Sequence, residues 1–182
     1  MSRLRFSTAR EVFETYPAAH QAVTMPPTTE PPLSFLARLL KGPAPMEAAG
    51  FCAFLLPRRE AVWWALQAVR SMQPPGMQDP GLAAAEAWVR EPGDRTRFEA
   101  LRQAQSGDRS RPGTFVAWAA GYSGGSMSEG HPIPTPSDLT AKMARIAVLN
   151  AINRLPARDR EGALRACVEA CIRLAEDEAG RR

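Results

Sequence analysis

The sequence predicts an all-α protein, an irregular bundle of about eight or nine short helices packed as antiparallel hairpins. Apolar residues recur at helical spacing, as in Val62, Leu66 and Val69. Prolines and capping residues divide the chain into helix-length segments, and no segment alternates like a strand. A short α-solenoid of the HEAT type is the alternative, because segments 45–72 and 80–105 form two successive helix pairs about 35 residues apart.

Helix-start signals define the N-terminal half. Thr8 and Glu11 form a capping-box pattern that predicts a helix to about Tyr16. The five prolines of residues 17–32 predict an extended, proline-rich strap. Pro32 can open the next helix, because its fixed φ suits a first helical position. Further helices are expected over 32–41, 45–56 and 58–72, with Pro57 between the last two.

The C-terminal half is divided into helices by the same kinds of capping residues and prolines. Asp79-Pro80 predicts a capped helix start, and Asp94 is expected to cap the following helix. A short apolar helix should run from Pro112 to about Ala120. Residues 121–136 are rich in glycine and proline and are expected to form an irregular loop. Thr135 and Asp138 are expected to cap the next helix, and Pro156 to separate it from the last one, so the predicted organisation is a single domain over 1–182.

Composition narrows the class of function. The chain has 182 residues, 23 basic and 19 acidic, with a net charge of +4. Basic and acidic residues alternate, as in Arg158-Asp159-Arg160-Glu161, which is typical of a solvated helix face rather than of a phosphate-binding stripe. Apolar runs are too short for a membrane span, and there is no secretory signal. We therefore expect a cytoplasmic protein that binds neither nucleic acid nor membrane.

Two catalytic or metal-binding patterns can be considered, and neither is favoured. Gly121-Tyr122-Ser123-Gly124-Gly125 fits G-x-S-x-G, with His131 in the same loop, but a serine nucleophile of that type needs a strand entering the turn. Cys167 and Cys171 are one helical turn apart, yet Cys52 and the two histidines would have to converge on them from irregular segments. The sequence thus predicts no catalytic residues, cofactor or metal.

Acidic residues on apolar helix faces are expected to be ion-paired. Glu60 and Glu86 are surrounded by apolar residues and can be partly buried. Pairing with arginines such as Arg58, Arg59 or Arg90 is a more common role for such a residue than catalysis.

The stretch Pro57-Arg58-Arg59-Glu60-Ala61-Val62-Trp63-Trp64 suggests a partner-binding surface. Two adjacent tryptophans on a helix point about 100° apart, so one can lie in the core and the other near the surface. Tryptophan and arginine are enriched in protein–protein hot spots, although both tryptophans could instead complete the core. The hypothesis combines this helix with a second helix and the glycine loop, and its residues are Arg58, Arg59, Trp63, Trp64, Trp88, Arg90, Tyr122, Ser123 and His131.

Three stretches resemble an uncharacterised bacterial family of helical domains: Phe51–Trp64, Leu82–Val89 and Ala119–Ser126. The family is loosely associated with type VI secretion gene clusters. No catalytic residues are established for it, so none carry over. The resemblance implies an accessory, adaptor or chaperone-like partner of a secretion component or effector.

The functional hypothesis is therefore a non-enzymatic helical interaction module that binds another protein. An immunity-type inhibitor of a toxin is an alternative, although the positive net charge argues against it. A serine hydrolase using Ser123 and His131 is a further, less favoured alternative. The oligomeric state does not follow from the sequence.

Overall fold

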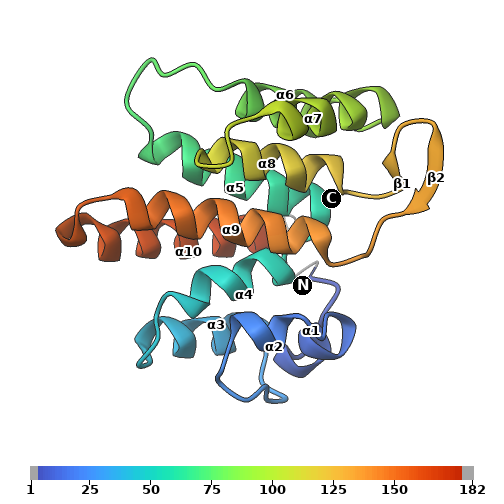
Figure 1. Ribbon diagram of the computed structural model, residues 1–182. Helices are drawn as coiled ribbons and strands as arrows, with labels where there is room; N and C mark the ends of the chain where they lie inside the picture. The colour runs from blue at the N-terminus through green and yellow to red at the C-terminus, as the bar shows by residue number, and fades with distance from the viewer. Residues whose placement is uncertain (1–3, 178–182) are drawn as a thin grey trace.

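A computed structural model describes residues 4–177 and shows an all-α bundle, as the sequence predicts (Figure 1). The described residues form ten helices and one small antiparallel hairpin, rather than the eight or nine helices expected. In chain order the elements are α1 Ala9–Thr15, α2 Ala19–Ala22, α3 Pro32–Lys41, α4 Glu47–Leu55, α5 Arg58–Met72, α6 Pro80–Arg90, α7 Asp94–Ser106, α8 Pro112–Gly121, β1 Ser126–Ser128, β2 His131–Pro134, α9 Leu139–Arg154 and α10 Ala157–Asp177.

Most helix starts follow the expected signals. The hydroxyl of Thr8 accepts a hydrogen bond from the backbone N–H of Glu11 (3.3 Å) at the start of α1. The carboxylate of Glu11 accepts one from Ser7 N–H (2.7 Å), one residue before the Thr8 N–H that a standard capping box uses. Asp79 caps α6 by accepting from two backbone N–H groups, and the prolines at the starts of α3, α6 and α8 occupy first helical positions.

One expected cap is wrong, and Asp138 occupies the expected N-cap position of α9 without capping through its side chain. Asp94 is the first residue of α7 rather than its cap, and its carboxylate pairs with Arg97. Asp138 precedes α9 but makes no capping hydrogen bond, since it pairs with Lys142 (2.7 Å). The hydroxyl of Thr135, three residues earlier, donates to the carbonyl of Gly124 (3.4 Å) and does not cap α9. In each case a side-chain or loop partner competes with the helix end for the capping group.

The strap of residues 17–32 is only partly extended, because it contains the one-turn helix α2. Its later part returns to the start of α1, where the carbonyls of Thr28 and Glu30 accept hydrogen bonds from the backbone N–H groups of Arg10 and Ala9. The strap therefore supplies acceptors for helix donors that would otherwise lack partners.

The loop of residues 121–136 is also more ordered than expected. Strands β1 and β2 pair antiparallel, with Ser126 opposite Pro134 and Ser128 opposite His131. Such short strands, interrupted by Pro132 and Pro134, carry too little alternation to be recognised in sequence.

The helices pack in antiparallel pairs around one continuous core. Helices α1–α3 lie at one end of the molecule and α6 and α7 at the other, with the remaining helices between them (Figure 1). Helix α5 contacts α4, α6, α8, α9 and α10, and α9 contacts α4, α5, α8 and α10. A solenoid repeat would contact only its neighbours, so the structure favours the bundle over the solenoid alternative.

Small residues allow α8 to lie very close to its neighbours. A Cβ added to Gly81 of α6 would lie 2.5 Å from the carbonyl oxygen of Gly113, and a Cβ on Gly121 would lie 2.5 Å from the side chain of Leu101 in α7. The hydroxyl of Thr140 in α9 donates to the carbonyl of Ala119 (2.9 Å). Helix α8 is thus in close backbone contact on three sides.

Within residues 4–177, no helix combines the length and apolarity that crossing a bilayer requires.

Trp64 is one of the largest buried side chains, with 1% of its surface exposed. Its indole N–H donates to the backbone carbonyl of Cys167 in α10 (2.8 Å), so it links α5 to the last helix.

We predict that Trp64→Ala lowers the free energy of unfolding by about 3–5 kcal/mol, because it leaves a large cavity. Trp64→Phe keeps most of the volume but leaves the Cys167 carbonyl without its donor, for a loss of about 1–3 kcal/mol. Urea denaturation of the two variants measures both values. A loss below about 1 kcal/mol for Trp64→Ala would show that Trp64 is not a core residue.

Candidate protein-interaction surface

The structure does not place all nine predicted partner-binding residues on one surface. Trp64 is in the core, and Trp88 is 6% exposed. The helical spacing of Trp64 and Trp88 in the sequence could not distinguish a surface contact from a core position. Both side chains face the core. Trp63, the other tryptophan of the pair, is half-buried at the edge of the core.

Two of the predicted arginines have structural partners. Arg59 donates from Nε to the carbonyl of Val89 (2.8 Å), near the C-terminal end of α6, where a cation is favourable. Arg90 pairs with Glu86 (2.6 Å), as the sequence suggested, and Arg70 pairs with the other carboxylate oxygen of Glu86 (2.6 Å). Arg58 is exposed and lies near the end of the hairpin loop, with Nη2 3.4 Å from the Ser137 carbonyl oxygen.

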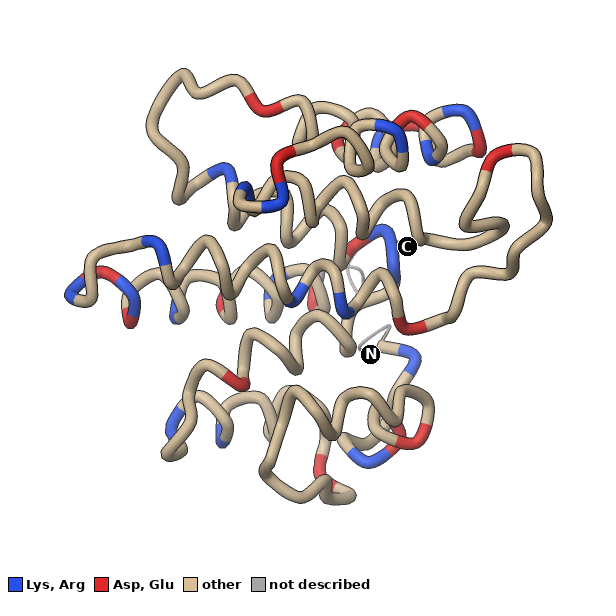
Figure 2. Tube along the Cα trace, viewed as in Figure 1, with Lys and Arg blue, Asp and Glu red and all other residues tan. Residues whose placement is uncertain are grey.

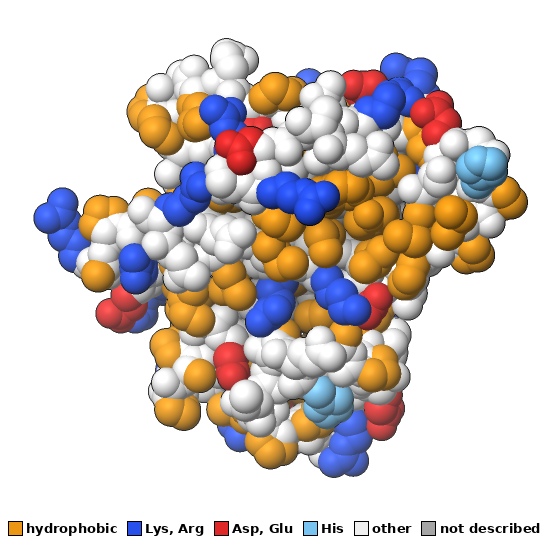
Figure 3. Space-filling view, viewed as in Figure 1, with side chains coloured by type: hydrophobic (Ala, Val, Ile, Leu, Met, Phe, Trp, Pro, Cys, Tyr) orange, Lys and Arg blue, Asp and Glu red, His pale blue; other side chains and the backbone are white. Residues whose placement is uncertain are grey.

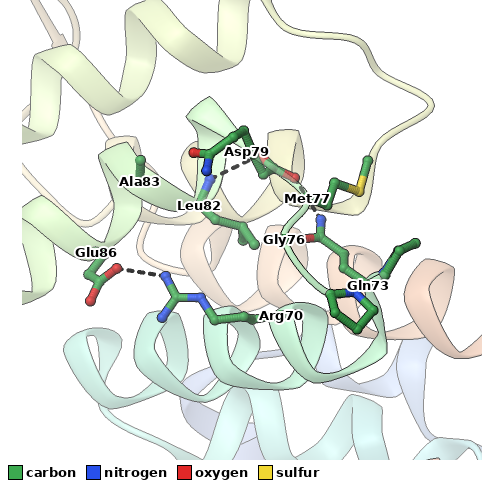
Figure 4. Close-up of a pocket in the computed structure, with 11 residues that line it drawn as sticks. Arg70, Gln73, Gly76, Met77, Asp79, Leu82, Ala83 and Glu86 are labelled. Carbon is green, nitrogen blue, oxygen red and sulfur yellow. Dashed lines mark hydrogen bonds and ion pairs between the residues drawn. The ribbon is translucent and has the colours of Figure 1, made fainter.

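Glu86 lies at one side of a hollow between α5, α6 and their connecting loop (Figure 4). The hollow has a volume of about 410 Å³. On its opposite side, Gln73 donates to the Asp79 carboxylate (2.7 Å), whose other oxygen caps α6. Both carboxylates are already paired or hydrogen-bonded, so the hollow is explained as the support of the α5–α6 loop rather than as an acid/base site.

A buried arginine attaches the hairpin to the bundle. Arg97 of α7 is 4% exposed, and its Nη1 donates to the carbonyls of Gly121 (3.2 Å) and Ser126 (2.5 Å). Its other nitrogens bind the carboxylate of Asp94. Gly125 lies against the guanidinium with φ +60°, and an added Cβ would be 3.0 Å from Nη2. Arg97 could not be identified from the sequence, because nothing in its helical spacing marks it as buried.

Helix α8 has an unusual distribution of side chains. Its buried positions include Gly113, Val116, Ala117 and Ala120, whereas its large aromatic residues are only half-buried. Figure 2 shows no acidic or basic residue on this helix. A helix on the molecular surface normally presents polar side chains to water, so the outer face of α8 is an exception.

The outward residues of α8 form an aromatic stripe. Phe115, Trp118 and Tyr122 are at positions i, i+3 and i+7, and the rings of Trp118 and Tyr122 stack with centroids 5.0 Å apart. Burial raises the pKa of the Tyr122 hydroxyl above its ordinary value, so it is a neutral donor at physiological pH.

Helix α9 continues this apolar surface. Met143 and Ile146 are half-buried and lie one turn apart on the helix that runs beside α8. Figure 3 shows hydrophobic side chains gathered over α8 and α9 and extending toward the hairpin, with basic side chains on either side. At the hairpin, Ile133 is 49% exposed. We call the set Phe115, Trp118, Tyr122, Met143 and Ile146 the α8–α9 surface.

Four basic residues lie in or directly before the helices of the α8–α9 surface, and one of them, Arg154 at the end of α9, donates to the carbonyl of Ser110. Arg111 precedes α8 in the same stripe, four residues before Phe115, and its charge adds to the hydrogen bonds from Ser110 that lower the pKa of Asp108. Lys142 pairs with Asp138. Arg145 has no ion pair among the described residues, and its Nε is buried without an acceptor beside Gly50 of α4. The charge of Arg145 is therefore uncompensated within this part of the chain.

Tyr122 is the one residue of the α8–α9 surface that was predicted from the sequence to bind a partner. The spacing of Phe115, Trp118 and Tyr122 was visible, but periodicity does not tell which face of an apolar helix meets the core. The sequence feature that could have indicated the outer face of α8 is side-chain size, because Gly and Ala occupy one face of this helix and aromatic residues the other.

Ser123 and His131 do not have the surroundings of a nucleophile–base pair. Residues Phe115–Ala120 lie in α8, so a helix and not a strand leads into Ser123. His131 is exposed at the start of β2, and its backbone carbonyl accepts from the Ser126 hydroxyl. Within residues 4–177, no hydrogen bond joins the side chains of Ser123 and His131.

The three cysteines are buried. Cys52 lies in helix α4, within the helix expected over 45–56, and its thiol contacts that of Cys171. Burial raises the pKa of the Cys52 thiol well above its ordinary value, with the Cys171 contact adding to the effect, and burial raises that of Cys167 to about 11. Neutral buried thiols are weak nucleophiles and poor metal ligands. Among the described residues, no cluster of three or more His, Cys, Asp or Glu residues could hold a metal ion.

A family model matches residues 35–175, from α3 into α10, and it describes a family of unknown function, DUF6931. The chain therefore belongs to this family. The match includes the three stretches on which the resemblance to an uncharacterised family was based, and confirms it to that extent. No curated protein and no solved structure matches the chain.

We predict that Glu86 makes stability depend on pH. Hydrogen bonds from Arg70 and then Arg90 hold the pKa of Glu86 below its ordinary value. The unfolded chain therefore binds the proton more readily, and the stabilisation present at neutral pH is lost as the pH falls below about 4–5. Urea denaturation over a pH series should show a wild-type advantage over Glu86→Gln that is largest near pH 7 and shrinks in acid.

The matched control for this pH series is Glu14→Gln, which changes an exposed carboxylate in α1 without an ion pair. Its difference from wild type should be smaller at every pH. An advantage over Glu86→Gln that stays constant down to pH 3 would show that the ion pairs do not shift the titration of Glu86.

We predict that Ser123 does not react with a serine-directed fluorophosphonate, because no base is hydrogen-bonded to its hydroxyl. Labelling followed by intact-protein mass spectrometry should give the same unmodified mass for wild type and Ser123→Ala. Stoichiometric labelling that Ser123→Ala abolishes would instead establish the serine hydrolase alternative.

Proposed function

We propose that this chain is a non-enzymatic helical interaction module that binds another protein through the α8–α9 surface. The observation that carries the proposal is that α8 has its small residues on the buried face and its large aromatic residues on the outer face. Small residues face the core, while Phe115, Trp118 and, directly after the helix, Tyr122 are only partly buried in a segment without charged residues. A contiguous exposed apolar patch with polar borders marks an interaction site in a soluble protein.

The composition of the surface favours a protein partner. Trp, Tyr and Arg are the residues most enriched in protein–protein hot spots; Trp118 and Tyr122 belong to the α8–α9 surface, and Arg145 lies on the same helix as Met143 and Ile146. We do not propose nucleic acid as the partner, because many basic residues elsewhere on the surface pair with acids, as Arg102 does with Glu99 and Glu129.

The partner class rests on the sequence resemblance alone. A type VI secretion component or effector, with this chain as a cytoplasmic adaptor or chaperone-like accessory, remains the proposal that the resemblance implies. The matched family description provides no link to secretion.

The proposed function is tested by comparing captured partners rather than by capture alone. Tagged wild type, Trp118→Ala and the control Met77→Ala are expressed in the native cells, recovered under gentle conditions and analysed by quantitative mass spectrometry. Met77 is 40% exposed in the α5–α6 loop, so its variant removes an exposed apolar side chain outside the α8–α9 surface.

We expect a partner that wild type and Met77→Ala retain equally. Trp118→Ala should bind it about 30-fold or more weakly, as truncation of a hot-spot residue does. Thermal unfolding must show that Trp118→Ala remains folded. If wild type recovers no partner, or if Trp118→Ala recovers it equally well, the proposed function is wrong.

A further inference from the structure

The kind of segment that the α8–α9 surface binds can be inferred from the shape of the surface, from the neighbouring hairpin and from the charges beside it. This inference rests on the proposed function and goes one step further, because it names the kind of segment that binds.

The shape favours a helical segment. Helices α8 and α9 pack side by side, and the outward stripe of α8 runs from Arg111 to Tyr122. At 1.5 Å per residue this stripe is about 16 Å long, which is about three turns of a docked helix. The side chains of Phe115 and Trp118 on one helix and Met143 and Ile146 on the other provide two rows between which an apolar helix face can lie.

The neighbouring hairpin is poorly suited to bind an extended strand instead. A strand added to a sheet edge needs backbone N–H donors on that edge. Pro132 and Pro134 occupy two of the four positions of β2 and have no N–H, and β1 has only three residues. An extended segment would therefore find few backbone partners beside the apolar surface.

The charge favours acidic residues on the occupant. Among the described residues, Arg145 has no ion-pair partner, and Arg111 is attracted to Asp108 without forming an ion pair. No acidic residue occurs from Pro112 to Ser128, and Asp138 is already paired with Lys142. A segment with carboxylates beside its apolar stripe would compensate these cations, whereas a basic segment would be repelled.

We propose that the α8–α9 surface binds an amphipathic helix of about three turns whose apolar stripe is flanked by carboxylates. The apolar stripe would contact Trp118 and Ile146, and a flanking carboxylate would pair with Arg145. The chain would then recognise an acidic helical segment of its partner protein.

The test is a selection from a displayed library of random peptides, about 16 residues long, against the full chain. Clones that also bind Trp118→Ala are removed. Enriched peptides should carry apolar residues at i, i+3 or i+4 and i+7, with more Asp and Glu than Lys and Arg. One such peptide, synthesised with a fluorescent label, should gain helical circular dichroism on binding.

Charge variants test the role of Arg145 with that peptide. Arg145→Gln should weaken binding about tenfold and reduce its dependence on salt, because a charge pair across the interface is lost. The matched control is Arg10→Gln, which removes an exposed arginine of α1 that forms no ion pair within residues 4–177 and should leave the affinity unchanged. If the two variants weaken peptide binding equally, Arg145 does not pair with a carboxylate of the bound segment.

Other outcomes overturn the proposal as a whole. Enrichment of basic peptides, of peptides with strand-like alternation, or of none at all would do so. Concentration-dependent self-association that Trp118→Ala abolishes would assign the surface to a second copy of the chain. In these cases, a partner captured from native cells by wild type but not by Trp118→Ala would still support the α8–α9 surface as the binding site. Only the proposal of an acidic helical segment would then be wrong. If no partner depends on Trp118, the proposed function is also wrong.

Discussion

The close packing around α8 is the constraint on which much of this structure depends. Four helices, α5, α6, α7 and α9, contact α8, and the small residues of its buried face allow α6 and α7 to approach at Gly113 and Gly121. Larger side chains at these positions would force the helices apart. Because small residues occupy the inward face, the bulky residues of α8 remain on the outward face. The same packing thus builds the core and exposes the α8–α9 surface.

The hairpin extends this arrangement through a single buried cation. Arg97 reaches from α7 to the end of α8 and to β1, and its charge is balanced by an exposed carboxylate on its own helix, Asp94. Burying an arginine is unfavourable unless its donors are satisfied, and here backbone carbonyls and a carboxylate satisfy them. The glycine-rich segment is therefore held against the bundle, beside the aromatic stripe, instead of extending freely from it.

The buried polar groups elsewhere explain why the sequence suggested several chemical sites that the structure does not support. Glu86 is held by two arginines, Asp79 caps a helix, and the three cysteines are enclosed by the core. Each of these residues is of a type that can take part in catalysis or metal binding, but its contacts here serve the packing of the fold. Arg145 differs, because its charge has no counterpart among the described residues, and it lies on the helix that contributes two of the five residues of the α8–α9 surface.

The sequence by itself determined the helical class and most helix boundaries, because proline positions, the Thr8 and Asp79 caps and 3.6-residue periodicity act locally. It also indicated that Glu86 would be paired. Only the tertiary structure decided which face of each apolar helix is buried, and it placed Trp64 and Trp88 inside and Trp118 at the surface. It also brought Cys52 to Cys171 and Arg97 to Ser126. These outcomes depend on contacts between residues far apart in the chain, and local spacing carries no information about them.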